Sequence, residues 1–212
     1  MTKQIAIVGI GTEVGKTLVS AIATLAFEAT YWKPIQTGYL NGKGDIDSKT
    51  IFHWTNAPIH PEAYLLQEPL SPHIAAKIDD VKIDISTLQI PKEIQGNLVI
   101  ETAGGLMVPI NDDLVYLDII QQWNIPVILT MNQYLGNINH TLLSIEMLKS
   151  KNIPILGIVS NGVALPDTNR WIEQYSKIPI ILEIPRLENI TTEVIQDLAS
   201  QLKFNLNKYG VE

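Results

Sequence analysis

The chain has 212 residues, enough for an α/β protein with a sizeable core, and its 46% hydrophobic and 17% charged residues exclude a disordered tail or a membrane protein. The formal net charge of -7, with no cluster of Lys or Arg, argues against a nucleic-acid partner or an anionic membrane surface. Cysteine is absent, which excludes disulfides and thiolate chemistry, and no signal-peptide pattern precedes the first strand, so we expect a cytoplasmic protein.

A strand, a glycine-rich turn and a helix open the chain. Residues 5–8 form an apolar run that predicts a buried strand, and residues 17–27, rich in Ala, Leu and Val, predict a helix. The segment between them is Gly9-Ile10-Gly11-Thr12-Glu13-Val14-Gly15-Lys16-Thr17. This context is typical of a P-loop, because the glycines let the backbone curl around a phosphate and the helix N-terminus turns free N–H groups toward it.

The loop supplies the groups that a nucleotide needs. We expect Lys16 to reach the β- and γ-phosphates of ATP, and the hydroxyl of Thr17 to bind Mg²⁺. The loop is one residue longer than the usual pattern, and it carries Glu13, whose charge would repel a triphosphate. We therefore expect Glu13 to face a cationic or amine substrate, and the alternative is an acid that only faces water.

Strands and helices alternate along the rest of the chain. Strands are predicted at residues 31–35, 97–101, 126–130, 155–159 and 179–182, and helices at residues 114–123, 137–151 and 191–204, the last capped by Thr191 or Thr192. Apolar runs without polar alternation favour a parallel sheet that is covered on both faces. We predict a single doubly wound α/β domain of the P-loop NTPase type over residues 1–212, with ligands at the carboxyl ends of its strands.

Charged residues end two of these strands. Glu101 closes the strand over residues 97–101, where a P-loop enzyme usually has its second Mg²⁺-binding acid, and an ordinary strand-end acid is the alternative. Lys33 lies at the end of the second strand, immediately before Pro34. It either contributes a positive charge to the site or extends that charge into solvent.

Loop and turn residues add further candidates. Asp45 and Asp47 lie in the polar loop after the second strand, and the sequence leaves open which of them, if either, reaches the metal. Asn161 and Gly162 close the strand that begins at residue 155. This pair either hydrogen-bonds the edge of a base or forms a plain turn.

Five ordered segments carry a family resemblance that runs from the first strand to about Leu187. They are Thr12-Glu13-Val14-Gly15-Lys16-Thr17, Lys33-Pro34-Ile35-Gln36-Thr37-Gly38, Ser71-Pro72-His73-Ile74-Ala75-Ala76 at a helix start, Glu101-Thr102-Ala103-Gly104-Gly105-Leu106-Met107-Val108-Pro109-Ile110 at an acidic turn, and Leu135-Gly136-Asn137-Ile138-Asn139-His140. Together they resemble the dethiobiotin synthetases, ATP-dependent carboxylases that close the ureido ring late in biotin synthesis.

The resemblance implies a reaction in which 7,8-diaminononanoate, CO₂ and ATP give dethiobiotin, ADP and phosphate. One amine forms a carbamate with CO₂, the carbamate attacks the γ-phosphate to give a carbamic-phosphoric mixed anhydride, and the second amine closes the ring. Because carbamate and phosphate are both anions, Lys16, Lys33 and Mg²⁺ would bridge them. Most of the rate would then come from positioning and charge neutralisation.

The resemblance also implies a role for each matching residue. Lys33 would hold the carbamate, Thr37 would hydrogen-bond the substrate, and Thr12 and Glu13 would lie beside the diamine. Thr17, Asp47 and Glu101 would surround Mg²⁺, with Asp45 competing for the place of Asp47. The other positions that would bind ATP are Glu13, Val14, Gly15, Lys16, Leu18, Thr102, Ala103, Gly104, Asn161 at the adenine, Gly162, Pro185, Arg186 and Leu187.

A homodimer with the active site at or near its interface is a further implication of the resemblance. Leu135, Gly136 and Asn139 of the second subunit would bind the distal carboxylate of the substrate at a helix N-terminus. His140 would only pack at that helix start. The chain departs from the family at Ile10 and Gly11, where a polar pair is usual, and at Thr102, where the acidic turn usually has glycine.

Two other functions fit parts of the sequence. One is a different amide-forming ligase of the same superfamily, but those usually have a glutaminase domain with a cysteine nucleophile, and this chain has no cysteine. The other is a partition-type ATPase switch, whose P-loop typically has a lysine where this chain has Ile10. Both remain less well matched than the dethiobiotin synthetases.

Overall fold

The computed structural model describes residues 2–40, 46–163 and 165–210. Its centre is a seven-stranded sheet in the order β4-β2-β6-β1-β7-β8-β9, and every pairing between these strands is parallel. The strands are β1 (Gln4–Gly9), β2 (Thr30–Trp32), β4 (Ile59–His60), β6 (Leu98–Gly105), β7 (Val127–Asn132), β8 (Ile155–Asn161) and β9 (Ile180–Ile184). The short strands β3 (Ile35–Gln36) and β5 (Tyr64–Leu65) form a separate parallel pair. The predicted parallel sheet is confirmed.

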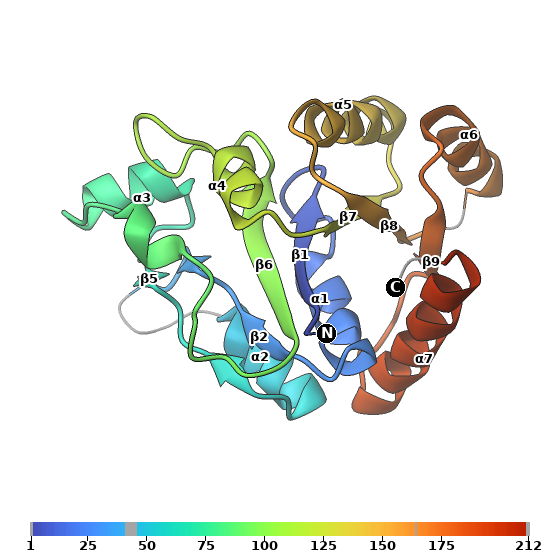
Figure 1. Ribbon diagram of the computed structural model, residues 1–212, viewed down its shortest axis with the longest axis horizontal. Helices are drawn as coiled ribbons and strands as arrows, with labels where there is room; N and C mark the ends of the chain where they lie inside the picture. The colour runs from blue at the N-terminus through green and yellow to red at the C-terminus, as the bar shows by residue number, and fades with distance from the viewer. Residues whose placement is uncertain (1, 41–45, 164, 211–212) are drawn as a thin grey trace.

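Helices cover both faces of the sheet (Figure 1). One layer contains α1 (Lys16–Ala26), α2 (Asp47–Thr55) and α7 (Thr192–Lys208), and the other contains α4 (Tyr116–Trp123), α5 (Asn137–Ser150) and α6 (Pro166–Ser176). The helix α3 (Pro72–Ile78) lies near the β3–β5 pair, and a 3-10 helix spans Ile85–Leu88. Within the described ranges, none of the helices combines the length and the apolar character that crossing a membrane requires.

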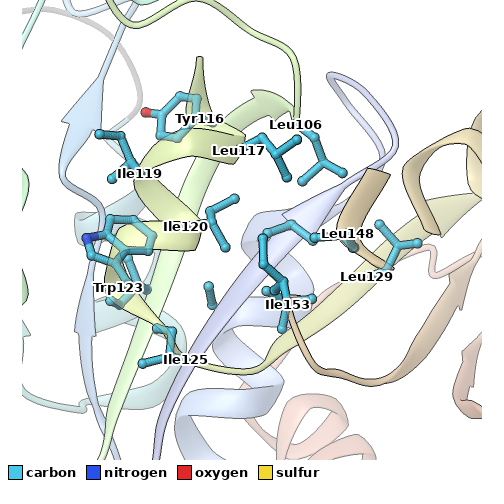
Figure 2. Close-up of a cluster of buried hydrophobic side chains, with 14 of the residues drawn as sticks. Leu106, Tyr116, Leu117, Ile119, Ile120, Trp123, Ile125, Leu129, Leu148 and Ile153 are labelled. Carbon is cyan, nitrogen blue, oxygen red and sulfur yellow. The ribbon is translucent and has the colours of Figure 1, made fainter. Parts of the chain in front are cut away.

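The two faces of the sheet bury two separate cores. Along β1, Ile5 and Ile7 pack into the core beneath α1 and α7, whereas Ala6 and Val8 pack into the core beneath α4 and α5. All four side chains are at most 2% exposed, so the strand shows no polar alternation. The second core is shown in Figure 2, where the apolar side chains of α4 meet those of β7 and α5.

The predicted strand over residues 31–35 is wrong in its second half. The strand β2 ends at Trp32, and the chain leaves the main sheet at Lys33 and Pro34. Proline has no N–H to continue the ladder, so the pairing with β6 cannot run on through it. Ile35 then pairs with Tyr64 of β5 instead. Lys33 therefore lies in the break between two strands, and not at the end of a single strand.

The structure also defines the extent of β6 and the start of α7. The predicted acidic turn at Ala103–Gly105 is part of β6, so the prediction that Glu101 closes its strand is wrong, and Thr102 occupies a strand position, which suits a β-branched residue. The last helix is capped by the hydroxyl of Thr191, which accepts a hydrogen bond from the N–H of Val194 at 3.4 Å. The elements α2, β4, β5 and α6 were not predicted, because they are short or mostly polar.

Candidate active site

The P-loop joins the carboxyl end of β1 to the start of α1, at the centre of the sheet. Two of its glycines are required by packing. A Cβ at Gly9 would lie 2.8 Å from Cγ2 of Val14, and a Cβ at Gly15 would overlap the side-chain amide of Asn161. Gly15 also has a φ of +93°, a conformation that L side chains rarely adopt. A side chain at Gly9 or Gly15 would therefore require Val14 or Asn161 to shift.

Lys16 is the first residue of α1 and is buried beneath the loop. Its ammonium donates a hydrogen bond to the carbonyl oxygen of Gly11 at 2.8 Å. Burial lowers the pKa of Lys16 to about 8; the carboxylates of Glu101 and Asp47 raise it in part, while the charge of Lys33 lowers it further. At neutral pH Lys16 is thus a cation for which the protein provides little solvation, which favours an anionic ligand.

Glu101 is the centre of a buried hydrogen-bond cluster. Its side chain lies on β6 and is 1% exposed. Its Oε1 accepts hydrogen bonds from the hydroxyl of Thr17 at 3.1 Å and from the ammonium of Lys33 at 3.3 Å, and its Oε2 accepts one from the hydroxyl of Tyr31 at 2.9 Å. A buried carboxylate without hydrogen-bond donors would be strongly destabilising, so Glu101 needs these partners. The cluster brings together side chains from α1, β2 and β6.

Lys33 joins this cluster to α2. Its ammonium also pairs with the carboxylate of Asp47, and its side chain is buried. The alternative in which Lys33 extends its charge into solvent is therefore wrong. Burial alone would lower the pKa of Lys33, but the attraction of Glu101 and Asp47 outweighs burial and raises the pKa above its ordinary value. Lys33 is consequently a fixed cation across the physiological pH range.

Asp47 occupies a different place from the one predicted. It is the first residue of α2 and not a loop residue, and its N–H donates a hydrogen bond to Oε1 of Gln36 at 3.2 Å. The helix start therefore aims its carboxylate at Lys33. Asp45, the competing candidate, lies outside the described residues.

The oxygen atoms around Glu101 suit Mg²⁺. Thr17 Oγ1 and Glu101 Oε1 lie 3.1 Å apart, and Asp47 pairs with the same Lys33 that contacts Glu101. These are hard oxygen donors, which Mg²⁺ prefers. Within the part of the chain that the structure describes, no group of three or more His, Cys, Asp or Glu residues forms a complete metal site. Mg²⁺ fits such a partial set because it keeps waters and binds substrate phosphates in addition.

The residues that follow Glu101 line the approach to the P-loop. Thr102 is buried, and its hydroxyl donates to the carbonyl oxygen of Ile7 at 3.3 Å, so it ties β6 to β1. Gly104 has a φ of +69°, and a Cβ there would lie 2.7 Å from Cγ2 of Val108 and 3.7 Å from Oγ1 of Thr12. Ala103 and Gly104 thus bring the backbone of β6 close to the predicted substrate side of the loop.

The predicted adenine side lies at the ends of β8 and β9. Asn161 ends β8, and its side-chain amide donates to the carbonyl oxygen of Val14 at 3.2 Å. The N–H of Gly162 donates to the carbonyl oxygen of Ile184 at 2.9 Å, which holds the end of β8 beside the segment Pro185-Arg186-Leu187. Asn161 and Gly162 are therefore more than a plain turn, because they connect the P-loop to the segment after β9.

Sequence reasoning missed a polar network behind this side. The amide of Gln133 donates to Ser160 Oγ at 2.8 Å and to Asn169 Oδ1 at 2.7 Å. Asn137 donates to Gln133 Oε1 at 2.7 Å, and Asn169 donates to Glu183 Oε2 at 2.9 Å. The network links β7, β8 and β9 to the starts of α5 and α6. The only signal in the sequence was that Gln133 and Ser160 lie at or near strand ends.

A hollow with a volume of about 430 Å³ lies beside the P-loop. Its lining residues are Ile10, Gly11, Thr12, Glu13, Val14, Asn132, Tyr134 and His140. Thr12 and Glu13 are exposed, and the hydroxyl of Tyr134 hydrogen-bonds Nδ1 of His140 across the first turn of α5. Tyr134, Asn132 and this pairing were not predicted. The hollow gives a polar ligand access to the loop.

The other residues predicted to bind substrate lie on two separate segments, at the start of α5 and after β3. Leu135 is fully exposed, Gly136 is the N-cap of α5 with a φ of +106°, and Asn139 is exposed in the first turn. Thr37 is half-buried after β3, where its carbonyl oxygen accepts from the amide of Gln36 at 2.8 Å. Gln36 also contacts Asp47, so Thr37 lies next to the Lys33 cluster.

Comparison with known proteins places this chain in a family. A family model described as an AAA domain matches residues 3–194. The ATP-dependent dethiobiotin synthetase BioD of Chlamydia pneumoniae is 43% identical over 212 residues, covering 99% of this chain and 94% of that protein. The protein of the same name from Cytophaga hutchinsonii is 43% identical over 94% of this chain and 97% of its own length. That from Rhodopseudomonas palustris strain HaA2 is 40% identical, with coverages of 99% and 97%.

Solved structures agree with the fold. A ParA family ATPase from Chlorobium tepidum superimposes with a TM-score of 0.58 at 13% identity, covering 100% of both chains. The cell division ATPase MinD of Pyrococcus furiosus gives 0.59 at 18% identity, covering 99% of this chain and 100% of that one. At such identities the likeness concerns the P-loop fold alone. The sequence identity of 40–43% over almost the whole of each relative decides the family, and the chain belongs to the dethiobiotin synthetases.

Proposed function

We propose that the protein closes the ureido ring of dethiobiotin from 7,8-diaminononanoate, CO₂ and ATP, with release of ADP and phosphate, as a step of biotin biosynthesis. The observation that carries the proposal is the position of Lys33. A buried ammonium beside a P-loop lysine, between Asp47 and Glu101, provides positive charge where two anions must meet. The relatives named dethiobiotin synthetase support this choice of reaction.

The chemistry balances in three steps. An amine nitrogen bonds to the carbon of CO₂ and loses a proton, which gives a carbamate. A carbamate oxygen then bonds to the γ-phosphorus as the bond to ADP breaks, which gives a mixed anhydride. The second amine bonds to the carbonyl carbon, phosphate leaves with the bonding electrons, and the nitrogen loses its proton as the ring closes.

Lys16 and Lys33 act on the two anions that must approach each other. Lys16 would leave the carbonyl of Gly11 to bind the β- and γ-phosphate oxygens, and Lys33 would hold the carbamate oxygens. Each cation is largely buried, so its interaction with an anion is stronger than it would be in water. Positioning and charge neutralisation would supply most of the rate, with no covalent intermediate on the protein.

Thr17, Asp47 and Glu101 are the residues that we propose hold Mg²⁺. Their oxygens gather beside the P-loop, and they would orient the ion against the phosphates. When bound, Mg²⁺ neutralises the charge that develops on the transferred phosphoryl group. The protein fixes the orientation of the side chains that would bind the ion, above all that of the Glu101 carboxylate.

The diamine would lie in the hollow beside the P-loop. Thr12 and Glu13 line this hollow and present oxygen acceptors to amine nitrogens, and Thr37 lies on the Lys33 side. We propose a homodimer in which Leu135, Gly136 and Asn139 of a second subunit bind the distal carboxylate of the substrate. The exposure of all three residues at the start of α5 supports this arrangement.

The nucleotide would extend from the P-loop toward β8 and β9. Asn161 would read the adenine, and the backbone of Pro185, Arg186 and Leu187 would line the base. Their location at the carboxyl ends of neighbouring parallel strands supports this direction. We further propose that residues 1–212 form one domain, which the continuous seven-stranded sheet supports.

The test is a reconstitution with labelled substrate. The purified protein is incubated with ATP, Mg²⁺, ¹³C-bicarbonate and 7,8-diaminononanoate, and dethiobiotin is detected by mass spectrometry. The expected result is a product that is heavier by one ¹³C and that appears only in the complete mixture, together with one ADP per ring closed. ATP hydrolysis that does not depend on the diamine, without labelled product, would overturn the proposal.

A further inference from the structure

The two oxygens of Glu101 have different partners. Oε1 faces Thr17 and Lys33, on the side of the P-loop, whereas Oε2 accepts a hydrogen bond only from Tyr31 among the described residues. Tyr31 has no place among the residues that the nucleotide, the diamine or the carbamate would contact. It is a fully buried tyrosine in the three-residue strand β2. Its hydroxyl therefore donates a hydrogen bond to one carboxylate oxygen of Glu101.

We propose that Tyr31 is a positioning residue that makes Glu101 bind the metal through Oε1 alone, and that it thereby favours Mg²⁺ over Ca²⁺. This inference rests on the proposed function in one respect, namely that Glu101 is a metal ligand. It goes beyond that function because it assigns the choice of metal to a residue that touches neither metal nor substrate.

The position of Tyr31 is rigid. Its backbone lies in β2 between β4 and β6, opposite Ile59 on one side and Val99 on the other, and its N–H donates to the carbonyl oxygen of Pro58 at 2.9 Å. Its ring packs in the core beneath α1 and α7. If Glu101 turned so that both oxygens faced the site, the buried hydroxyl of Tyr31 would lose its partner, which is unfavourable for a buried donor. The hydrogen bond at 2.9 Å therefore fixes the rotation of the carboxylate.

A carboxylate held by one oxygen discriminates between the two ions. Mg²⁺ requires near-octahedral geometry at short distances and keeps several waters, which one oxygen from Glu101 permits. Ca²⁺ accepts six to eight ligands at longer distances and often takes both oxygens of a carboxylate. With Oε2 bonded to Tyr31, the second oxygen is withheld from the ion, and the affinity for Ca²⁺ is reduced more than the affinity for Mg²⁺.

The test measures how much each metal tightens nucleotide binding. The dissociation constant of fluorescent mant-AMPPNP is measured in EDTA, in Mg²⁺ and in Ca²⁺, and the gain is the ratio of the EDTA value to the value with metal. For Tyr31→Phe we expect the gain with Mg²⁺ to fall about tenfold, as is usual when a partner of a metal ligand is removed, and the gain with Ca²⁺ to stay within about twofold of the wild type, because the freed Oε2 offsets the lost positioning for that ion. The affinity in EDTA should stay as in the wild type, which also checks that the P-loop is folded.

Tyr116→Phe is the matched control. Tyr116 is also a fully buried tyrosine, shown at the start of α4 in Figure 2, but its hydroxyl is not among the groups that hydrogen-bond Glu101 in the described chain. Removal of that hydroxyl should leave both gains unchanged. An equal loss of both gains in Tyr31→Phe, or an unchanged ratio of Mg²⁺ to Ca²⁺, would overturn the inference.

Glu101→Gln separates this inference from the proposed function. If the variant keeps the gains of the wild type, Glu101 is not a metal ligand and the proposed metal site fails. If Glu101→Gln loses the gains in nucleotide affinity while Tyr31→Phe keeps them, the proposed metal site stands and the role of Tyr31 fails. In the double variant, Tyr31→Phe should have no further effect, because Tyr31 acts only through Glu101.

Discussion

The two ends of the active site are built in opposite ways. Around Glu101, the side chains are buried and charged, and each is held by hydrogen bonds or ion pairs within the described chain. At the start of α5, Leu135, Gly136 and Asn139 are exposed and uncharged. The buried cluster is thus preorganised within one chain, whereas the start of α5 is exposed and would bind the far end of the substrate only in the homodimer that we propose.

The largest expected effect tests the buried end. Lys33→Arg keeps the charge but moves it, so the carbamate should lose its fixed partner and kcat should fall about 10²- to 10³-fold. The affinity for mant-AMPPNP should change by less than about threefold, because Lys16 still binds the phosphates. Steady-state kinetics and nucleotide titration check both values. The exposed Lys77→Ala on α3 is the control and should match the wild type. A Lys33 variant that loses nucleotide affinity and keeps kcat would contradict the carbamate role.

The open end should give an intermediate effect. Asn139→Ala should raise the KM for 7,8-diaminononanoate about tenfold and leave kcat almost unchanged, since the residue would bind the distal carboxylate and not the reacting atoms. Initial rates over a range of diamine concentrations measure this split. An unchanged KM would remove Asn139 from the site.

Mixing two impaired variants decides which subunit contributes Asn139. At a low concentration of 7,8-diaminononanoate, Lys33→Ala and Asn139→Ala should each have little or no activity. If Asn139 acts across the interface, a heterodimer carries one site with both wild-type residues, and random subunit exchange restores about a quarter of the activity. If both residues serve the site of their own chain, mixing restores nothing.

The smallest effect concerns pH. The pKa of Lys16 is about 8 in the free protein, and only its cation binds phosphate well. Nucleotide affinity should therefore be nearly constant below about pH 7.5 and should weaken as pH rises through 8. Lys33, whose pKa is raised above its ordinary value, should contribute no change in this range. Titration of mant-AMPPNP at a series of pH values measures the midpoint, and an affinity that stays constant up to pH 9 would contradict the assignment to Lys16.

Much of the fold followed from local pattern. The apolar runs of β1, β6, β7, β8 and β9 are buried on both faces, so neither face carries a polar signal and a parallel sheet was the direct interpretation. The end of β8 then indicated where Asn161 would lie, whereas Glu101 lies within β6 and not at its end. The P-loop was predicted because its glycines and Lys16 appear at a strand–helix joint.

What the sequence did not predict depends on contacts between distant segments. Tyr31 looks like an ordinary core residue of a strand, since nothing near it in the chain indicates that Glu101, 70 positions later, accepts its hydrogen bond. Asp47 appeared to be a loop acid because the polar residues before it hid the helix start. The network of Gln133 and Asn169 consists, apart from Glu183, of neutral side chains, and each of its members could equally have faced water.

The central position of β1 in the sheet determines which parts of the molecule unfold first. Local unfolding usually starts at weakly held edges, and here β4, with two residues, and β9 are the outer strands. The strand β1, which leads into the P-loop, is flanked by β6 and β7, so the amides of β1 should exchange with deuterium among the slowest. The segment after β9 should exchange sooner. Mild denaturant should therefore release the base of a bound nucleotide before it releases the phosphates.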